Sequence, residues 1–545
     1  RRGPLGVQSD ITIRGGSFDQ VLILINGVRM NDAQTGHHTL YLPIEMLDIE
    51  RIEIIKGPAA RSYGQNAFSG AVNIITKSPK NTGLQLHSSL GSFNTWQVGM
   101  NTSLNLLNDN LSQSLAINYA KSDGYDYNRD FNSGSLFYQG KLNLPENATL
   151  QWFSGGSIRH FGANGFYALP THIDQYEEVS TSISSLLFKK VYNKMSLTAR
   201  VSHRWNDDYY EFVRNKPEIF NNKTTSNRFT LDINTSYYNA LGILGVGVEY
   251  SDESLKSIGL GDHNRSIASG FIEQKINILS DQLQVVPGVF INKFSDRDIQ
   301  IFPGIDASFL FKKKFKIFAG LNYANRIPTY TDLYYRSSVE RGNPDLLSES
   351  MRSIEVGLEW KQRYSQIKLS AYRNQTSNLI DWTKNATTDQ FWIARNYVAT
   401  NFTGLEMSGS IDLKNLLNLP NTCLIDLSTN FIDAKTANSD NQYITRYQFN
   451  HLGNQTLANI RYGIINDNVF INVSYRYLDR ASEDIDPSTG RNLLDAQLWD
   501  ASVMYKWKKV ELKYTANNIT NQAYKEINNV LMPGRWHQLR LGMGI

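Results

Sequence analysis

The pattern of apolar and polar residues along the chain changes near Lys80. Before it, short apolar runs alternate with glycines, and residues 21–25 (VLILI) have the continuous apolar character of a buried strand. After it, apolar and polar residues alternate in short segments to the end of the chain. A period of two is typical of β-strands. The pattern predicts a small α/β segment, 1–79, followed by a long antiparallel β array, 80–545.

The two faces of these predicted strands indicate a membrane barrel. In residues 366–373, Ile367, Leu369 and Ala371 lie opposite Lys368 and other polar side chains. Charged and amide side chains on one face predict a wet lumen rather than a packed core. No stretch approaches the roughly 18 continuous apolar residues of a spanning helix. The aromatic content of 12% fits girdles at the two membrane interfaces.

Turn positions and length together predict the number of strands. Residues 503–516 form a predicted hairpin whose turn is Lys508-Lys509, as at a periplasmic end, whereas the polar stretches 207–227 and 479–492 fit extracellular loops. Residues 79–545 comprise 467 residues. At about 20 residues for each strand with its connection, this length gives roughly 22 or 23 strands, and bacterial barrels favour even numbers. We therefore predict a 22-stranded transmembrane β-barrel.

Composition and charge exclude several classes of protein. A net charge of +4 gives no broad basic field for nucleic acid. The single cysteine, Cys423, excludes internal disulfides and cysteine-based metal clusters. No Gly-X-Ser-X-Gly elbow or persuasive nucleophile–histidine–acid set points to an enzyme. Arg1 is not a natural start and residues 11–13 (ITI) are predicted to form a strand, so we expect the native N-terminus to precede this sequence.

Several motifs resemble those of the TonB-dependent outer-membrane receptors, over both ends and the middle of the chain. The segments that resemble the plug domain of this family are 10–16 (DITIRGG), 24–28 (LINGV), 52–59 (IEIIKGPA), 63–64 (YG) and 70–76 (GAVNIIT). Those that resemble its barrel are 326–334 (RIPTYTDLY), 342–346 (GNPDL), 517–524 (NNITNQAY) and 533–535 (PGR).

The resemblance implies an energised importer in the outer membrane of a Gram-negative bacterium. In such receptors a plug domain sits inside the barrel, and the TonB complex in the periplasm supplies force. A passive porin is the competing interpretation, but an open pore needs no plug. Two features depart from the family. The TonB box should precede Arg1, and the sequence ends on Ile545 rather than on an aromatic residue.

The segment up to Thr76 looks most like cobalamin-type receptors of Bacteroidetes. That resemblance implies a corrinoid ligand, with a ferric siderophore or another metal chelate as the alternative, and a surface lipoprotein as a further partner. The family presents loops such as 31–39 to the ligand. The resemblance and the chemistry of the residues together give these expected ligand-binding residues: Gln34, Thr35, His37, His38, Thr39, Gln65, Asn66, Asn164, Phe166 and Tyr167.

Charged residues in the plug motifs predict its attachment to the barrel. Arg14, Glu53 and Arg61 would lie inside the lumen, where buried charges need partners, so we expect them to hold the plug to the wall through polar contacts. Such an interface can be broken by force more readily than an apolar one.

Metal and cofactor signals are few. The side chains of His37 and His38 should diverge, and no histidine–carboxylate spacing supports a metal site there. Haem receptors of this family usually carry a histidine between the two barrel motifs, and residues 329–342 have none. Asp126, Asn128 and Asp130 imitate the start of a calcium loop, but the glycine and glutamate that an EF-hand requires are missing. Irregular calcium binding by an extracellular loop is the only cofactor expectation.

Overall fold

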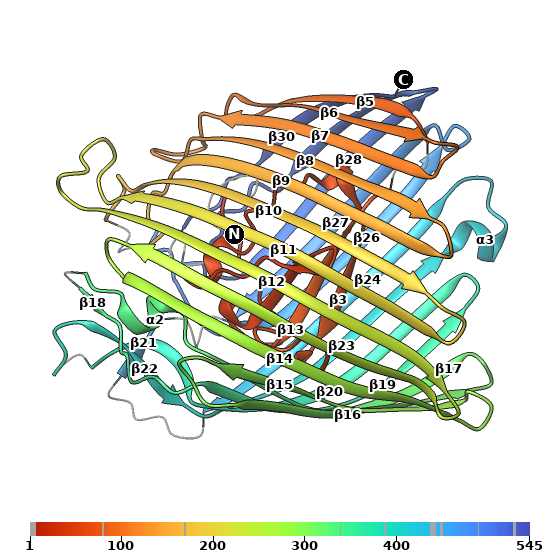
Figure 1. Cartoon of the computed structure of the whole chain (residues 1–545). Coiled ribbons are helices and arrows are strands. Elements are labelled where there is room, and N and C mark those ends of the chain that lie inside the picture. The colour runs from red at the N-terminus through yellow and green to blue at the C-terminus, as the bar shows by residue number, and fades with distance from the viewer. Residues whose placement is uncertain are drawn as a thin grey trace.

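A computed structural model gives the fold of the chain. It describes residues 7–78, 81–167, 171–337, 339–385, 388–436, 443–446, 451–488, 490–526 and 530–544. A closed antiparallel β-barrel of tilted strands surrounds a small N-terminal domain, which lies within its lumen (Figure 1). The described helices include none that is both long enough and apolar enough to cross a membrane.

The barrel has 22 strands, as predicted. Each strand pairs antiparallel with the next, and the last strand pairs with the first through Leu541 and Ser88. The closed ring leaves no open sheet edge, which the absence of water in a bilayer core requires. The barrel strands are β5 Gly83–Gly91, β6 Thr95–Leu106, β7 Leu111–Ser122, β8 Phe131–Leu144, β9 Ala148–Gly162, β10 Tyr176–Val191, β11 Met195–Glu211, β12 Asn221–Asn239, β13 Gly242–Ser257, β14 Gly261–Ile278, β15 Leu283–Phe294, β16 Gln300–Phe311, β17 Phe315–Arg326, β19 Glu349–Gln362, β20 Ser365–Ser377, β23 Thr400–Asp412, β24 Cys423–Thr436, β26 Leu452–Ile464, β27 Val469–Arg480, β28 Ala496–Trp507, β29 Val510–Asn517 and β30 Trp536–Gly544.

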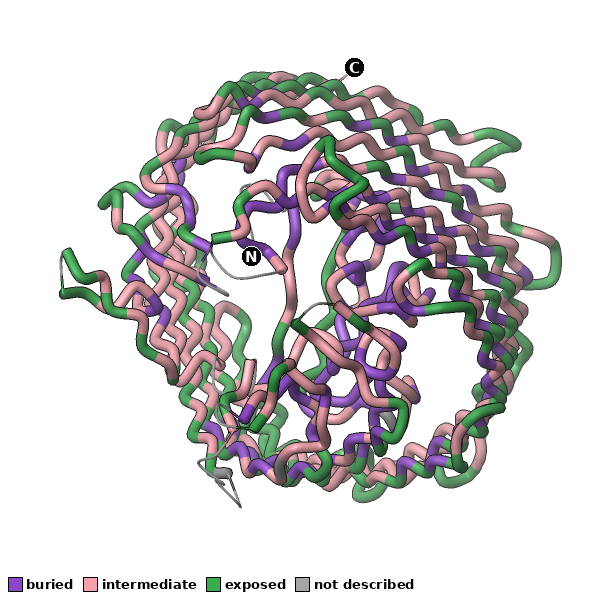
Figure 2. The backbone as a smooth tube through the Cα atoms, turned by 90° about the vertical axis from the view of Figure 1, so that its left-hand side faces the viewer, coloured by how far each residue is buried: buried purple, intermediate pink, exposed green. Residues whose placement is uncertain are grey.

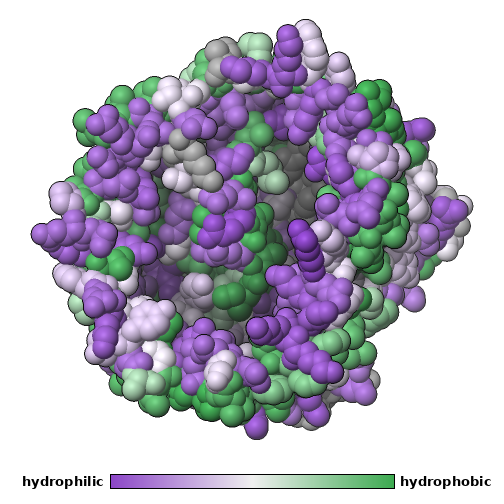
Figure 3. Space-filling view, turned by 90° about the vertical axis from the view of Figure 1, so that its right-hand side faces the viewer, coloured by the Kyte–Doolittle hydropathy of each residue, from purple (hydrophilic) through white to green (hydrophobic). Residues whose placement is uncertain are grey.

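The wall is apolar outside and polar inside. On β13, Val246, Val248 and Tyr250 are exposed on the outer surface, whereas Glu249 between them forms ion pairs. Successive side chains on a strand point to opposite faces, so alternating apolar and polar residues give an apolar face toward lipid and a polar face toward the lumen. Figure 3 shows the end of the barrel at which α3 (Leu413–Leu417) lies, with hydrophilic groups around a hollowed centre.

Connections alternate between long and short, which distinguishes the two ends of the barrel. Short turns such as 508–509, which joins β28 to β29, lie at one end, so the predicted hairpin is confirmed. Long connections such as 481–495, between β27 and β28, lie at the other, extracellular end. The predicted loop 207–227 is shorter than expected and spans only 212–220. Its flanks continue as paired strands because polar side chains bond across them, as Thr225 does to Asp207 (2.5 Å).

The plug is built on a four-stranded sheet in the order β2-β1-β4-β3, with β1 parallel to β4. Seen from the extracellular end, it lies inside the ring of strands (Figure 2). Every residue of β1 is buried, as its apolar run predicts. The plug elements are η1 Phe18–Gln20, β1 Val21–Ile25, β2 Val28–Arg29, η2 Gly36–His38, η3 Met46–Asp48, β3 Ile49–Lys56, α1 Ala60–Tyr63 and β4 Gly70–Thr76.

The predicted strand at residues 11–13 is wrong. These residues pair with no strand, because the chain turns directly after them at Arg14 and Gly15, whose φ angles are 52° and 81°. Further elements cover the extracellular mouth and are α2 Tyr330–Tyr334, β18 Glu340–Arg341, β21 Leu379–Asn385, β22 Trp392–Val398 and β25 Tyr443–Thr445.

Arg14 joins the plug to the barrel wall through two carboxylates. Its guanidinium makes two hydrogen bonds to Glu355 (3.0 and 2.8 Å) and two to Glu406 (3.2 and 3.0 Å). The Arg14 side chain is 2% exposed and lies over the ring of Tyr372, 4.2 Å from its centroid. Paired, planar contacts of this kind fix orientation as well as position.

Arg61 makes a second connection, whereas the contacts of Glu53 within the described residues stay inside the plug. Arg61 donates to Glu273 (3.1 Å), to the carbonyl of Val286 (3.1 Å) and to Asp306. The expectation that Glu53 holds the plug to the wall is wrong. It lies on the exposed strand β3, where its partners are Arg51 (2.8 Å) and Asn73 (3.1 Å) of the plug itself.

Val248→Arg should destabilise the barrel by about 2–4 kcal/mol, because a cation near the bilayer midplane has no polar partner. Val248 is 57% exposed on the outer surface, in the middle of the membrane-facing part of β13. The free energy of unfolding in lipid vesicles, measured by denaturant titration of tryptophan fluorescence, checks this. Ile258→Arg is the matched control, since this exposed side chain follows β13 at the extracellular end and should cost about 0–1 kcal/mol. Equal costs for both variants would contradict an outward, lipid-facing Val248.

Arg14→Met should loosen the plug by about 3–5 kcal/mol, because it leaves Glu355 without its cation and Glu406 with only the half-exposed Lys56, 3.4 Å away. The measurement is the urea concentration at which bilayer conductance through the barrel appears. We expect a lower urea midpoint for Arg14→Met. Glu53→Gln, which removes a charge of the plug that does not reach the wall, should keep the midpoint of the unmodified protein. An unchanged midpoint for Arg14→Met would show that this contact does not retain the plug.

Candidate functional site

The plug presents residues 31–39, the histidine loop, to the extracellular half of the barrel. Asn31 fastens its start to β1, since its amide accepts from the backbone N–H of Ile23 (3.0 Å) and donates to the carbonyl of Val21 (2.9 Å). Thr35 caps η2 and accepts from the N–H of His37. The loop is therefore shaped by the plug itself before it meets the wall.

Asp32 ties this loop to the wall through a buried ion pair. Its carboxylate receives hydrogen bonds from Arg204 of β11 (2.5 Å) and Ser226 of β12 (2.7 Å). Burial raises the pKa of Asp32, but Arg204 and His38 outweigh burial and hold the pKa below its ordinary 3.8. The carboxylate is therefore charged, and its charge is matched across the interface.

Asp19 supports the loop from within the plug. Its carboxylate accepts from the backbone N–H of Gly36 (2.5 Å), which connects η1 to η2. Burial raises the pKa of Asp19 to about 7, although the charge of Arg326 opposes this shift. Asp19 is thus a partly buried carboxyl group that links η1 to the histidine loop and lies within electrostatic reach of Arg326 in the first barrel motif.

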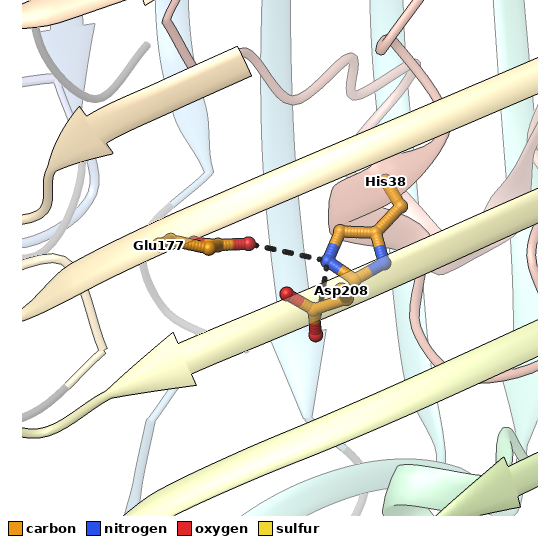
Figure 4. A group of neighbouring side chains, drawn as sticks. All are labelled: His38, Glu177 and Asp208. Carbon is orange, nitrogen blue, oxygen red and sulfur yellow. Dashed lines mark ion pairs between the residues drawn. The ribbon is translucent and has the colours of Figure 1, made fainter. Parts of the chain in front are cut away.

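His38 points into the wall and meets two carboxylates. Its Nε2 lies 3.4 Å from Glu177 of β10 and 3.8 Å from Asp208 of β11 (Figure 4). Burial lowers the pKa of His38, but Asp208 and Glu177 raise it by more, to about 9. All three side chains are buried.

His37 points away from His38, as expected for neighbouring residues in a loop. Its Nδ1 lies 3.0 Å from Asp10, and its ring stacks on Phe18 with centroids 3.9 Å apart. The ring of Tyr167 lies 6.2 Å away. The two adjacent histidines therefore lie in different surroundings: His38 contacts the barrel wall, and His37 contacts Asp10 and Phe18 of the plug.

Half of the expected ligand-binding residues are buried and occupied within the protein. Phe166 packs in an aromatic core, and Asn164 donates to the carbonyl of Tyr127 (2.7 Å). Gln34 donates to Asp208 (2.8 Å), and Thr39 donates to the carbonyl of Gly36 (2.7 Å). Together with His38, these side chains are directed at partners within the protein. The expected residues that keep partial exposure are Thr35, His37, Gln65, Asn66 and Tyr167.

The structure brings only some of these partly exposed residues together. Tyr167 accepts from Gln8 (2.8 Å) and donates to Glu177, so it lies beside the histidine loop. Gln65 and Asn66 follow α1, which packs against β14 to β17. Within the described part of the chain, the backbone carbonyl of Gln65 accepts from Arg29.

The calcium candidates are held by an arginine. Asp130 receives two hydrogen bonds from Arg214 (2.7 and 3.0 Å), and the amide oxygen of Asn128 receives a third (3.1 Å). Asp126 lies 3.7 Å from Arg129. In this structure the oxygen atoms of these three residues therefore contact the guanidinium groups of Arg214 and Arg129.

Several residues that build the site have no motif of their own. Arg204, Glu177 and Asp208 are charged residues on the inward face of barrel strands in which polar and apolar residues alternate. The same holds for Glu355 and Glu406. The sequence could place these residues on the polar face of a strand, close to its extracellular end or its middle. This placement identifies lumen charges as a class but does not say which of them meet.

Two family models match the chain. The TonB dependent receptor-like β-barrel model matches residues 56–521, and the TonB-dependent Receptor Plug Domain model matches residues 1–71. The matched family consists of receptors and transporters rather than enzymes.

Relatives and solved structures agree with this match. The chain is 26% identical to a protein named vitamin B12 transporter BtuB of Vibrio vulnificus, over 98% of this chain and 85% of that protein. A protein of the same name from Photobacterium profundum is 23% identical over 82% of this chain and 72% of its own length. These relatives come from Vibrio and Photobacterium, not from the Bacteroidetes that the motifs suggested.

The fold matches solved receptors over almost the whole chain. The siderophore receptor PirA from Acinetobacter baumannii has a TM-score of 0.79 at 16% identity, covering 100% of this chain and 94% of its own. The copper transporter OprC has a TM-score of 0.81 at 15% identity, covering 100% and 93%. Barrel, plug and family models together show that the chain belongs to the TonB-dependent receptors of the Gram-negative outer membrane.

Proposed function

We propose that this receptor binds a corrinoid, with cobalamin as the first candidate, at its extracellular face and imports it with force supplied by the TonB complex. The observation that carries the proposal is the match to vitamin B12 transporters along 98% of the chain, plug and barrel together. The likeness to siderophore and copper receptors supports the fold alone, because identity there is 15–16%.

A cavity beside the histidine loop supports ligand binding at the plug apex. It has a volume of about 400 Å³, and Asp10 and Phe18, the two residues that hold His37, both line it. Arg476 and Gln455 of the wall add polar groups, and Leu478 adds an apolar surface. A mixture of apolar surface and a few placed polar groups is typical of ligand sites. A lining of this mixed character suits a flat macrocycle with a polar rim.

The contacts that hold the plug fit energised transport. Arg14, Arg61 and Asp32 join it to the wall through charged hydrogen bonds that lie among polar lumen groups. Water can replace such bonds as the plug moves, whereas a broad apolar interface would have to be exposed at about 25 cal/mol per Å². We infer that ligand binding near His37 is coupled to displacement of the plug through this loop.

Calorimetry on the detergent-purified protein tests the ligand. We expect cyanocobalamin to bind with one site per chain, and ferric siderophores and haem to give no heat of binding at the same concentrations. Binding of a ferric siderophore in place of cyanocobalamin would favour the alternative, a metal-chelate receptor of the same fold. An absence of any cyanocobalamin signal at tens of micromolar would contradict the proposal.

His37→Ala should weaken cyanocobalamin binding about tenfold, or about 1.4 kcal/mol, because it removes the ring that contacts Asp10 and Phe18, two residues of the cavity lining. His160→Ala is the matched control. This imidazole lies on the outer side of β9 near Glu178 and should leave the dissociation constant unchanged. Equal affinity of the His37→Ala variant and the unmodified protein would place the ligand away from the histidine loop.

A further inference from the structure

His38, Glu177 and Asp208 form a cluster that the transport function leaves unexplained. One ligand atom from each lies within 4.8 Å of those from the other two. Figure 4 shows both carboxylates directed at the same edge of the imidazole, toward Nε2. The three residues are only 3%, 2% and 4% exposed, and they come from the plug and two neighbouring barrel strands.

The charges of this cluster do not balance. The neighbouring pair of Asp32 and Arg204 is neutral by itself. With both carboxyl groups ionised, Glu177 and Asp208 carry two negative charges, and a protonated His38 leaves one in excess, which either a further proton or a bound cation would remove. The described neighbours that bond to the two carboxylates, Tyr167 and Gln34, are uncharged donors. An excess charge in a buried site is costly unless a cation compensates it.

Buried oxygen atoms in the cluster also lack partners. Oδ1 of Asp208 is inaccessible to solvent and has no hydrogen-bond partner among the residues that the structure describes, although Oδ2 of the same carboxylate accepts from Gln34. The amide oxygen of Gln34 is likewise buried without a partner. Nearly all buried polar atoms in proteins are paired, so these two oxygens leave room in the cluster for a donor or a cation.

We propose that a divalent transition-metal ion of the Zn²⁺ type binds to His38, Glu177 and Asp208 and fastens the plug to β10 and β11. One imidazole nitrogen and two carboxylates are a donor set that Zn²⁺ uses, and a tetrahedral ion has a fourth position for water or the Gln34 carbonyl. With a neutral imidazole, the ion and the two carboxylates sum to zero charge. The inference does not depend on which ligand is transported.

The surroundings can adapt to the neutral imidazole that a metal requires. Nδ1 of His38 lies 3.4 Å from the amide nitrogen of Asn206, whose oxygen accepts from the hydroxyl of Thr181 (2.6 Å). Exchange of the Asn206 amide oxygen and nitrogen would let Nδ1–H donate, and the Thr181 hydroxyl could then accept. A metal-bound histidine commonly donates its other N–H in this way.

Zinc titration of the chelator-stripped, full-length chain in detergent tests the site. We expect one Zn²⁺ per chain by calorimetry, with affinity reduced at least about 100-fold in Glu177→Gln, Asp208→Asn and His38→Gln. His37→Gln is the matched control, since it removes the adjacent imidazole but not a proposed ligand, and it should bind Zn²⁺ as the unmodified protein does. Loss of binding in His37→Gln alone, or retention in the three ligand variants, would overturn the proposal.

A second measurement needs no variant and so does not depend on variant folding. Crystals of the unmodified protein soaked in ZnCl₂ should give an anomalous peak at the zinc edge between His38, Glu177 and Asp208. A peak only at the pair of His37 and Asp10, or no ordered zinc at all, would overturn the site. The heat-modified gel mobility of each variant shows whether its barrel has folded before its affinity is compared.

Discussion

The ring of backbone hydrogen bonds that closes between β30 and β5 is the constraint on which the rest of the structure depends. A bilayer core offers no water to an open strand edge, so the sheet must return to its first strand. Closure at 22 strands leaves a lumen too wide to be filled by the barrel's own side chains. A plug can therefore be accommodated, and the inner face of every strand becomes an interface with it or with water.

The plug–barrel interface is organised by charge. Arg14 sits between Glu355 and Glu406, and Asp32 pairs with Arg204, in each case with a plug residue on one side and a wall residue on the other. Buried ion pairs contribute little net stability relative to apolar packing, but they are costly to leave half-made. Such contacts specify one position of the plug strongly without adding a large apolar area that would resist its movement.

The histidine loop shows how neighbouring residues can take separate tasks. Both histidines belong to η2. His37 lies against Asp10 and Phe18 beside a cavity, while His38 contacts Glu177 of β10 and Asp208 of β11 in the wall. A ligand that displaces His37 would act on a loop that His38 and Asp32 attach to the barrel. The loop thus connects the contacts of His37 beside the cavity to contacts that hold the plug, and Arg14, which itself lines the cavity, provides a second connection.

The sequence by itself determined the architecture. Its period of two requires strands with one apolar face, its length sets their number, and the motifs around Arg14 and Arg61 mark the plug, because these properties depend on residues that are close along the chain. Glu53 is a charged residue in a plug motif, as Arg14 and Arg61 are, yet on β3 its partners are Arg51 and Asn73 of the plug. Only the tertiary structure decided which charges meet. His38 lies more than a hundred residues before Glu177 and Asp208 in the sequence, and their convergence depends on barrel register and plug orientation, which no local pattern of side chains encodes.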